Sequence, residues 1–216
     1  MSPLSSSPNW PPQPPLVAIL RGLPPGEADD VGRVLLDAGF GALEVPLNRD
    51  GALASIARLV ALAPRQVAVG AGTVTTTAQV DAVAATGATL IVSPHFDEAV
   101  VRHTKALGML SVPGVFTASE AFAALRAGAD ALKIFPAEAM PPAGLQALAS
   151  VLPAGTALWP VGGVTAESLS AWQRVGATGF GIGGALYKPG VALDELRRRA
   201  EAYVQAWNSS RSATHP

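Results

Sequence analysis

A lysine lies in the middle of an apolar stretch that is typical of a buried strand. Lys133 occurs in DALKIFP, residues 130–136, whereas the other two lysines of the chain, Lys105 and Lys188, lie in polar surroundings. An apolar, partly dehydrated site disfavours an ammonium group, so the pKa falls and the neutral amine becomes available. A neutral amine attacks ketones to form a Schiff base, which draws electrons from a neighbouring C–C or C–H bond. The alternative is a lysine whose stem is buried while its ammonium pairs with a carboxylate.

A glutamate occupies a similar position in a second apolar segment. Glu44 follows Leu43 in ALEVPLN. Burial raises the pKa of an unpaired carboxyl, which makes such a group a proton shuttle near neutral pH. The alternative is a structural ion pair with Lys133 or Arg21. The two roles are compatible, because an ion pair in the resting site can also be the catalytic pair.

Two diglycine turns end the last two apolar segments of the chain. Gly162–Gly163 lies in VGGVT and Gly183–Gly184 in GIGGA, and Thr165 is the expected N-cap of the segment after the first turn. Glycine lets backbone N–H groups approach an anion closely, although glycine also serves turns for its conformation alone. Ala185 follows the second turn, so a phosphate here would be held mainly by backbone groups.

One local pattern positions these residues, because it recurs along residues 16–207. A helix-like segment ends in a small residue plus Gly, which accepts the left-handed conformation that closes a helix, and an apolar strand follows. The pattern is clearest at 37–46, 85–94, 126–136 and 174–184, and weaker strands are expected at 16–20, 66–70, 109–113 and 156–161. Helical spacing occurs at 27–38, 50–63, 76–86, 97–107, 118–127, 142–151, 166–175 and 191–207.

These units predict an α/β fold, a single-domain (β/α)8 TIM barrel. Strands that are apolar on both faces indicate a parallel sheet covered on all sides, and eight β–α units in about 190 residues favour a closed barrel. A doubly wound sheet is the alternative. The expected divisions are a mobile Pro/Ser-rich N-terminal arm at 1–15, the barrel at 16–207 and a flexible tail at 208–216.

The barrel prediction brings the candidate residues to one place. Active sites of such barrels lie at the carboxyl ends of the strands. Those ends carry Arg21, Glu44, Thr73, Pro94, Lys133, Gly162–Gly163 and Gly183–Gly184. One Arg, one Glu and one Lys are therefore expected to converge with two glycine turns.

The composition narrows the class of function. The chain has 216 residues, 49% hydrophobic and 14% charged, with a net charge of −1, so no nucleic acid or anionic membrane is expected as a partner. It has no cysteine, no apolar run of the ~20 residues that span a membrane and no secretory signal, which predicts a cytoplasmic enzyme. His95 and His103 lack a carboxylate at ligand spacing, so no metal or cofactor is expected.

Seven motifs in order resemble one enzyme family. ILRG, ALEVPLN, VGAGTV, IVSPH, ALKIFPAE, VGGVT and GIGGALYKPG, over residues 16–190, resemble the bacterial 2-keto-3-deoxy-6-phosphosugar aldolases. ILRG and EVPLN are similar to the galactonate branch of that family. The gluconate branch typically has Arg at the place of Asn48, Thr at Val161 and Ser at Ala185; here Arg49 follows Asn48.

The resemblance implies a class I, metal-independent carbon–carbon lyase that works as a homotrimer on a phosphorylated 2-keto-3-deoxy sugar acid. Lys133 would form the Schiff base at the C2 ketone and Glu44 would move protons through a water, which releases pyruvate and D-glyceraldehyde 3-phosphate. The remaining roles that it implies are substrate carboxylate binding by Arg21 and Thr73, walls of the pyruvate pocket from Pro94 and Phe135, and phosphate binding by Gly162, Gly163, Gly183 and Gly184.

Two other functions compete with this interpretation. A phosphosugar epimerase or decarboxylase on the same barrel would use paired carboxylates, a metal or an Asp–Lys array. A non-catalytic phosphosugar-binding barrel would be expected to lose Lys133 or Glu44, and this chain has both.

Overall fold

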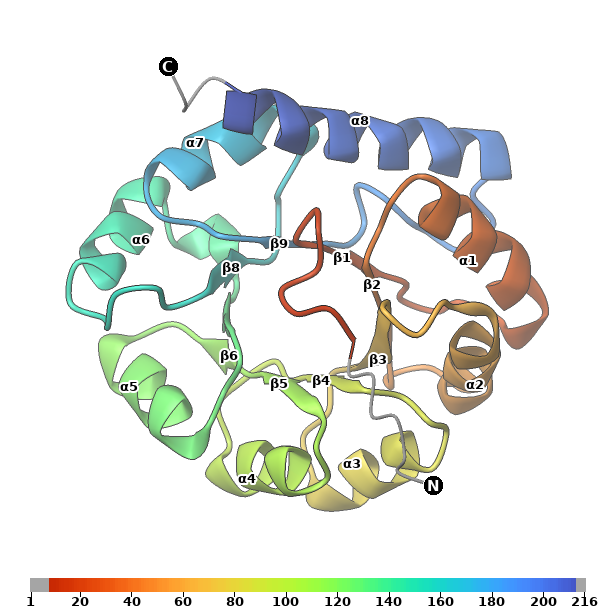
Figure 1. Cartoon of the computed structure of the whole chain (residues 1–216), viewed down its shortest axis with the longest axis horizontal. Helices are drawn as coiled ribbons and strands as arrows, with labels where there is room; N and C mark the ends of the chain where they lie inside the picture. Colours follow the sequence, from red (N-terminus) through yellow and green to blue (C-terminus); the bar gives the residue numbers. More distant parts are fainter. Residues whose placement is uncertain (1–7, 213–216) are drawn as a thin grey trace, which may run out of the picture.

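The computed structural model describes residues 8–212, in which parallel strands alternate with helices around a common axis (Figure 1). Residues 1–7 of the predicted arm and 213–216 of the predicted tail lie outside the described residues. The strands are β1 (Leu16–Ile19), β2 (Ala42–Pro46), β3 (Ala68–Gly72), β4 (Leu90–Val92), β5 (Leu110–Val112), β6 (Gly114–Val115), β7 (Leu132–Ile134), β8 (Leu158–Pro160) and β9 (Phe180–Ile182).

The strands pair as two parallel sheets. The larger sheet has the order β5-β4-β3-β2-β1-β9 and the smaller has β6-β7-β8. The prediction of a parallel α/β fold is therefore confirmed. Only Pro113 separates β5 from β6, and a proline has no N–H to give to a ladder. At the other junction an isolated parallel bridge joins Val161 to Gly181, and the Thr178 N–H donates to the Leu158 carbonyl over 2.9 Å.

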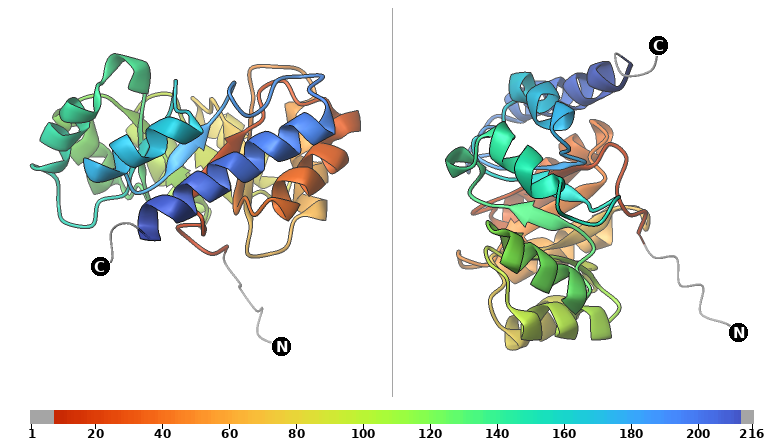
Figure 2. Two further views of the ribbon diagram at one scale, coloured as in Figure 1. Left: turned by 90° about the horizontal axis from the view of Figure 1, so that it is seen from above. Right: turned by 90° about the vertical axis from the view of Figure 1, so that its left-hand side faces the viewer.

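Helices cover the outside of the strands, as both views in Figure 2 show. They are α1 (Ala28–Asp37), α2 (Ala52–Leu62), α3 (Thr77–Ala84), α4 (Glu98–Ala106), α5 (Ala118–Ala127), α6 (Pro142–Ala149), α7 (Leu169–Arg174) and α8 (Leu193–Ser212), with short 3-10 turns η1 (Pro25–Glu27), η2 (Ala137–Ala139) and η3 (Ala166–Ser168). Each of the eight predicted helices is present. Thr76 and Thr117 begin α3 and α5 with capping boxes, which satisfy N–H groups that a helix start leaves free.

Apolar side chains fill two separate layers. The larger layer lies between strands and helices and includes Leu35, Phe40 and Phe180. The smaller one lies inside the curled sheets and is centred on Trp159, a fully buried indole. The indole fits because the residue just before β9 is glycine: a Cβ built on Gly179 would lie 2.6 Å from Trp159 Cε2. The large Trp159 side chain thus lies where the residue that faces it, Gly179, has no side chain.

Residues 8–15, the described part of the predicted arm, cross the amino-terminal ends of the strands. The Phe180 N–H donates to the Pro15 carbonyl over 2.9 Å, which joins this segment to β9. Among the helices of residues 8–212, none is long and apolar enough to cross a membrane.

Candidate active site

The predicted site residues lie together at the carboxyl ends of the parallel strands. Lys133 lies in β7 and Glu44 in β2, and Thr73 follows β3 directly. The other positions follow the ends of β1, β4, β7, β8 and β9 and are Arg21, Pro94, Phe135, Gly162, Gly163, Gly183 and Gly184. Because parallel strands all end at the same edge, residues from distant parts of the chain meet there.

Lys133 is a buried amine beside an aromatic ring. Its residue is 6% exposed, and Nζ lies 4.7 Å from the centre of the Phe135 ring. Burial lowers the pKa of Lys133; the nearby Glu44 carboxylate opposes that shift and the Arg21 guanidinium adds to it. The net direction favours the neutral amine, the form that attacks a carbonyl carbon.

Glu44 lies deeper, at 2% exposure. Burial raises the pKa of Glu44, while the positive charges of Lys133 and Arg21 lower it. Among the ion pairs found within residues 8–212, none joins Glu44 to Lys133 or Arg21. The carboxyl is therefore coupled to the amine through charge, without the direct ion pair that was the alternative interpretation.

A glycine that the sequence motif did not single out makes room for this carboxyl. A Cβ built on Gly72 would lie 1.6 Å from Glu44 Oε1, far inside van der Waals contact. Gly72 is the last residue of β3 and pairs with Pro46 of β2, so the Glu44 side chain lies across the neighbouring strand. Any larger residue at position 72 would displace the acid.

Thr73 has an uncommon backbone conformation. Its φ is +58°, and within residues 8–212 it is the only residue other than glycine with a positive φ. The left-handed region is costly for a β-branched side chain, and such conformations cluster at functional sites. The turn therefore holds the Thr73 side chain at the edge where β2 and β7 end.

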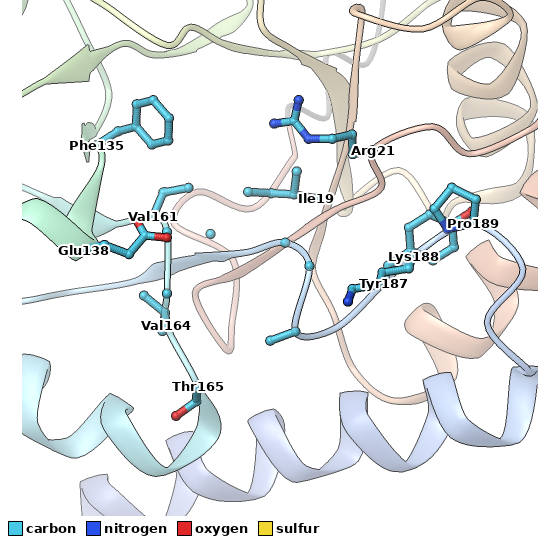
Figure 3. Close-up of a pocket in the computed structure, with 16 residues that line it drawn as sticks. Ile19, Arg21, Phe135, Glu138, Val161, Val164, Thr165, Tyr187, Lys188 and Pro189 are labelled. Carbon is cyan, nitrogen blue, oxygen red and sulfur yellow. The ribbon is translucent and has the colours of Figure 1, made fainter.

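A cavity of about 510 Å³ opens beside Phe135 (Figure 3). Of the predicted residues, it is lined by Arg21, Phe135, Gly162, Gly163, Gly183 and Gly184. Glu44, Thr73, Pro94 and Lys133 do not line it. Lys133 is close behind its wall, because the Phe135 ring that faces the cavity also contacts the amine.

The two glycine turns differ in why they need glycine. Gly162 and Gly163 have φ values of +111° and +62°, and added Cβ atoms would lie 2.1 and 2.7 Å from the Glu138 side chain. Gly183 and Gly184 have no such crowding, with nearest atoms 4.0 Å away. The first turn therefore depends on glycine for its shape, whereas the second leaves open space in front of its backbone.

Two charged residues of this cavity were missed from the sequence. Glu138 lies against the first glycine turn, and Lys188 extends along the second, with Cε 4.0 Å from a Cβ built on Gly184 (Figure 3). Lys188 lies in polar surroundings in the sequence, but its place four residues after a diglycine is a usable signal. Thr165, predicted as an N-cap, does begin η3 and also lines the cavity.

The arrangement combines a buried amine, a buried acid and a cavity lined by two cationic side chains, Arg21 and Lys188. In residues 8–212 no group of three or more His, Asp or Glu side chains is placed to hold a metal. The amine can form a covalent bond with a carbonyl carbon, and the acid can move a proton nearby.

Comparison with known proteins defines the class. Residues 13–197 match the family model described as KDPG and KHG aldolase. The chain therefore belongs to the KDPG and KHG aldolase family, and it is a carbon–carbon lyase.

Two curated relatives and one solved structure are similar over nearly the whole chain. A probable 2-dehydro-3-deoxy-6-phosphogalactonate aldolase of Rhizobium meliloti is 45% identical, over 90% of this chain and 92% of the relative. The 2-dehydro-3-deoxy-6-phosphogalactonate aldolase of Escherichia coli is 43% identical, over 93% and 98%. A structure described as native KDPGal has a TM-score of 0.90 at 43% identity, over 92% of this chain and 96% of that one.

Proposed function

We propose that this chain cleaves 2-dehydro-3-deoxy-6-phospho-D-galactonate into pyruvate and D-glyceraldehyde 3-phosphate through a Schiff base on Lys133. The observation that carries the proposal is the buried Lys133 amine, with its lowered pKa, next to Glu44 and to the wall of a cavity that can hold an anion. The galactonate substrate is supported by the names of the similar curated relatives.

The reaction follows from the two buried groups. The Lys133 amine attacks the C2 ketone, and loss of water gives the iminium. Glu44 takes the C4 hydroxyl proton through a water; the C3–C4 bond breaks, its electrons pass to the iminium, and the aldehyde product forms from C4–C6. Protonation of the resulting enamine at C3 and hydrolysis of the iminium release pyruvate and the free amine.

The remaining residues fix the two ends of the substrate. Arg21 and Thr73 hold the carboxylate, and Pro94 and Phe135 form the walls around the pyruvate portion. Gly162, Gly163, Gly183 and Gly184 bind the phosphate through backbone N–H groups. The open space beside Gly183 and Gly184 supports this assignment, because the nearest atoms of residues 8–212 to an added Cβ lie 4.0 Å away.

We also infer that the two sheets form one closed (β/α)8 barrel in a single domain over residues 16–207. Support comes from the bridge between Val161 and Gly181 at one junction and from the single residue, Pro113, at the other. The family resemblance further supports a homotrimer that works in the cytoplasm.

Trapping with borohydride tests the chemistry. Incubation with pyruvate and borohydride should add one reduced pyruvate adduct to the mass of the protein, on Lys133. Lys133→Arg should give no adduct and no cleavage with the fold intact, because a guanidinium is not deprotonated in proteins. An epimerase, a decarboxylase or a binding protein would give no adduct with the unaltered chain.

The alternatives are an aldolase specific for the gluconate epimer of the same sugar acid and a dual-specificity enzyme that cleaves both epimers. Cleavage rates with both 6-phospho epimers should favour the galactonate form in kcat/KM. Preference for the gluconate form would overturn the substrate assignment and leave the Schiff-base chemistry standing.

A further inference from the structure

The segment before β1 is fixed to three strand starts around the amino-terminal end of the barrel. The Asn9 N–H donates to the Gln66 carbonyl before β3 over 3.1 Å, and the Pro15 carbonyl accepts from Phe180 of β9. Pro12 packs on Gly41 before β2, where an added Cβ would lie 2.7 Å from Pro12 Cβ. In Figure 1 this segment runs across the middle of the molecule, and in the left view of Figure 2 it lies below the strands.

An aromatic stack lies under this segment. The Trp10 ring stacks on the Trp159 ring with centroids 4.8 Å apart and an angle of 29° between planes. Trp159 is 1% exposed, and its indole N–H has no hydrogen-bond partner among residues 8–212. Trp10 packs against the apolar cluster inside the curled sheets and belongs to no layer under the helices. A partly buried indole therefore covers a fully buried one.

The covered indole adjoins the reactive amine. Trp159 of β8 is the direct partner of Lys133 in the register of β7 and β8. Paired residues on neighbouring parallel strands project to the same face, so both side chains enter the interior. A ring stack thus joins Trp10 to Trp159, and the strand register places Trp159 beside Lys133.

We propose that Trp10 seals the amino-terminal end of the barrel and, through Trp159, keeps water away from the chamber that holds Lys133. Trp10 is then a positioning residue for the Schiff-base step, which rests on the function proposed above. The segment acts only by excluding water, because residues 8–15 (PNWPPQPP) carry no charged or titratable side chain.

A change at Trp10 should alter the hydration of Lys133 and leave the other groups around the amine as they are. The charged groups that act on the amine are Glu44 of β2 and Arg21 after β1, and the Phe135 ring lies over it. Among the ring contacts found within residues 8–212, Trp10 contacts Trp159, and Lys133 contacts Phe135. Water that enters past Trp159 would reduce the desolvation that lowers the pKa of Lys133, so that pKa would rise.

The test measures the initial rate of pyruvate trapping by borohydride against pH. In Trp10→Ala the curve should move to higher pH by about one unit, which makes trapping at neutral pH about tenfold slower. Trp10→Phe keeps a ring over Trp159 and should restore the curve of the unaltered chain. An unmoved curve in folded Trp10→Ala overturns the proposal, as does a Trp10→Phe curve that moves equally far.

Two further variants keep the result interpretable. Gly41→Ala adds a methyl group that displaces Pro12, and with it the segment, without altering Trp10. It should therefore move the pH curve of trapping in the same direction as Trp10→Ala. If Trp10→Ala does not fold, Gly41→Ala tests the proposal in its place. Trp207→Ala removes an indole that packs on Phe180 under the helices, and it should leave the curve in place. The proposal that Trp10 seals the barrel is overturned if the pH curve moves as far in Trp207→Ala as in Trp10→Ala. It is also overturned if the curve does not move in Gly41→Ala. Failure of the unaltered chain to trap pyruvate would instead overturn the proposed function.

Discussion

Two buried groups of opposite charge act on each other at the centre of the site. The Glu44 carboxylate raises the pKa of Lys133, and the Lys133 ammonium lowers the pKa of Glu44, while burial shifts both in the opposite directions. Each group therefore approaches the neutral range from its own side. At the scale of single residues, burial, which outweighs this mutual attraction, makes an amine nucleophile and a proton shuttle available together.

Replacing Glu44 should separate its two effects. Glu44→Gln removes the charge that raises the pKa of Lys133, so that pKa should fall further and the pH profile of pyruvate trapping should move to lower pH. Cleavage of the sugar should slow by about 10²–10⁴, the usual loss for a positioned acid or base. Trapping and cleavage are measured on the same protein. A loss of less than roughly tenfold in cleavage would mean that Glu44 is only a structural partner.

Replacing Thr73 by glycine should preserve or raise the stability of the protein and lower its activity. Thr73→Gly relieves a left-handed conformation that costs about 1–2 kcal/mol, while glycine adds roughly 0.4–1 kcal/mol of entropy to the unfolded chain. The free energy of unfolding should thus stay unchanged or rise by up to about 1.6 kcal/mol, and kcat/KM should fall because the side chain is lost. Urea unfolding and cleavage assays measure the two quantities.

Thr75→Gly is the matched control, because the φ of Thr75 is not positive. It should destabilise the protein by roughly 0.5–1 kcal/mol without lowering kcat/KM. If Thr73→Gly destabilises by as much as Thr75→Gly, the strain at Thr73 has no energetic consequence.

At the scale of elements, the turn after β8 should control phosphate binding. Gly163→Val places a branched side chain at φ +62° and into Glu138, so it should raise KM for the phosphorylated sugar and leave pyruvate trapping nearly unchanged. The unaltered protein should also prefer the phosphorylated sugar to the unphosphorylated one. Equal kcat/KM values for the two sugars would remove the phosphate assignment and leave the aldolase chemistry intact.

A substitution in open space provides the comparison for Gly163→Val. Gly26 has no atom within 4 Å of an added Cβ and no positive φ. Gly26→Val should therefore leave KM for both sugars unchanged, and a matching rise there would point to a general loss of structure.

Much of the element order was predictable, because glycine closes the helices of repeated units at fixed places. The boundaries of the elements were less predictable. β3 lies at Ala68–Gly72, whereas a strand was predicted at 66–70, and α8 continues to Ser212, whereas the helix was expected to end at 207. Lys133 and Glu44 stood out since each is a charge in an apolar strand. Glu138 and Gly72 did not stand out, because what matters at each is a neighbour from a distant part of the chain, on the turn after β8 for Glu138 and on β2 for Gly72. The spacing of residues along the sequence does not indicate such neighbours.

At the scale of the whole molecule, the proposed homotrimer is consistent with the low charge content. Only 14% of residues are charged, against roughly 25% in typical globular proteins, and subunit contacts in the proposed trimer would cover apolar surface. Sedimentation equilibrium should give three times the chain mass of 21.9 kDa at micromolar concentration. A mass equal to that of a single chain would overturn the homotrimer and leave the site chemistry untouched.

The contact between Gly72 and Glu44 constrains how this site can change by descent. Gly72→Ala collides with the flexible end of the acid, so its harm should fall on turnover more than on folding. In Glu44→Ala the carboxylate is absent, so adding Gly72→Ala to that variant should change folding and activity very little. The two positions are thus epistatic: alanine at 72 is harmful in an active ancestor and silent in an inactive one. A lineage that loses the acid first can then drift at position 72, after which restoring the glutamate alone no longer restores the enzyme.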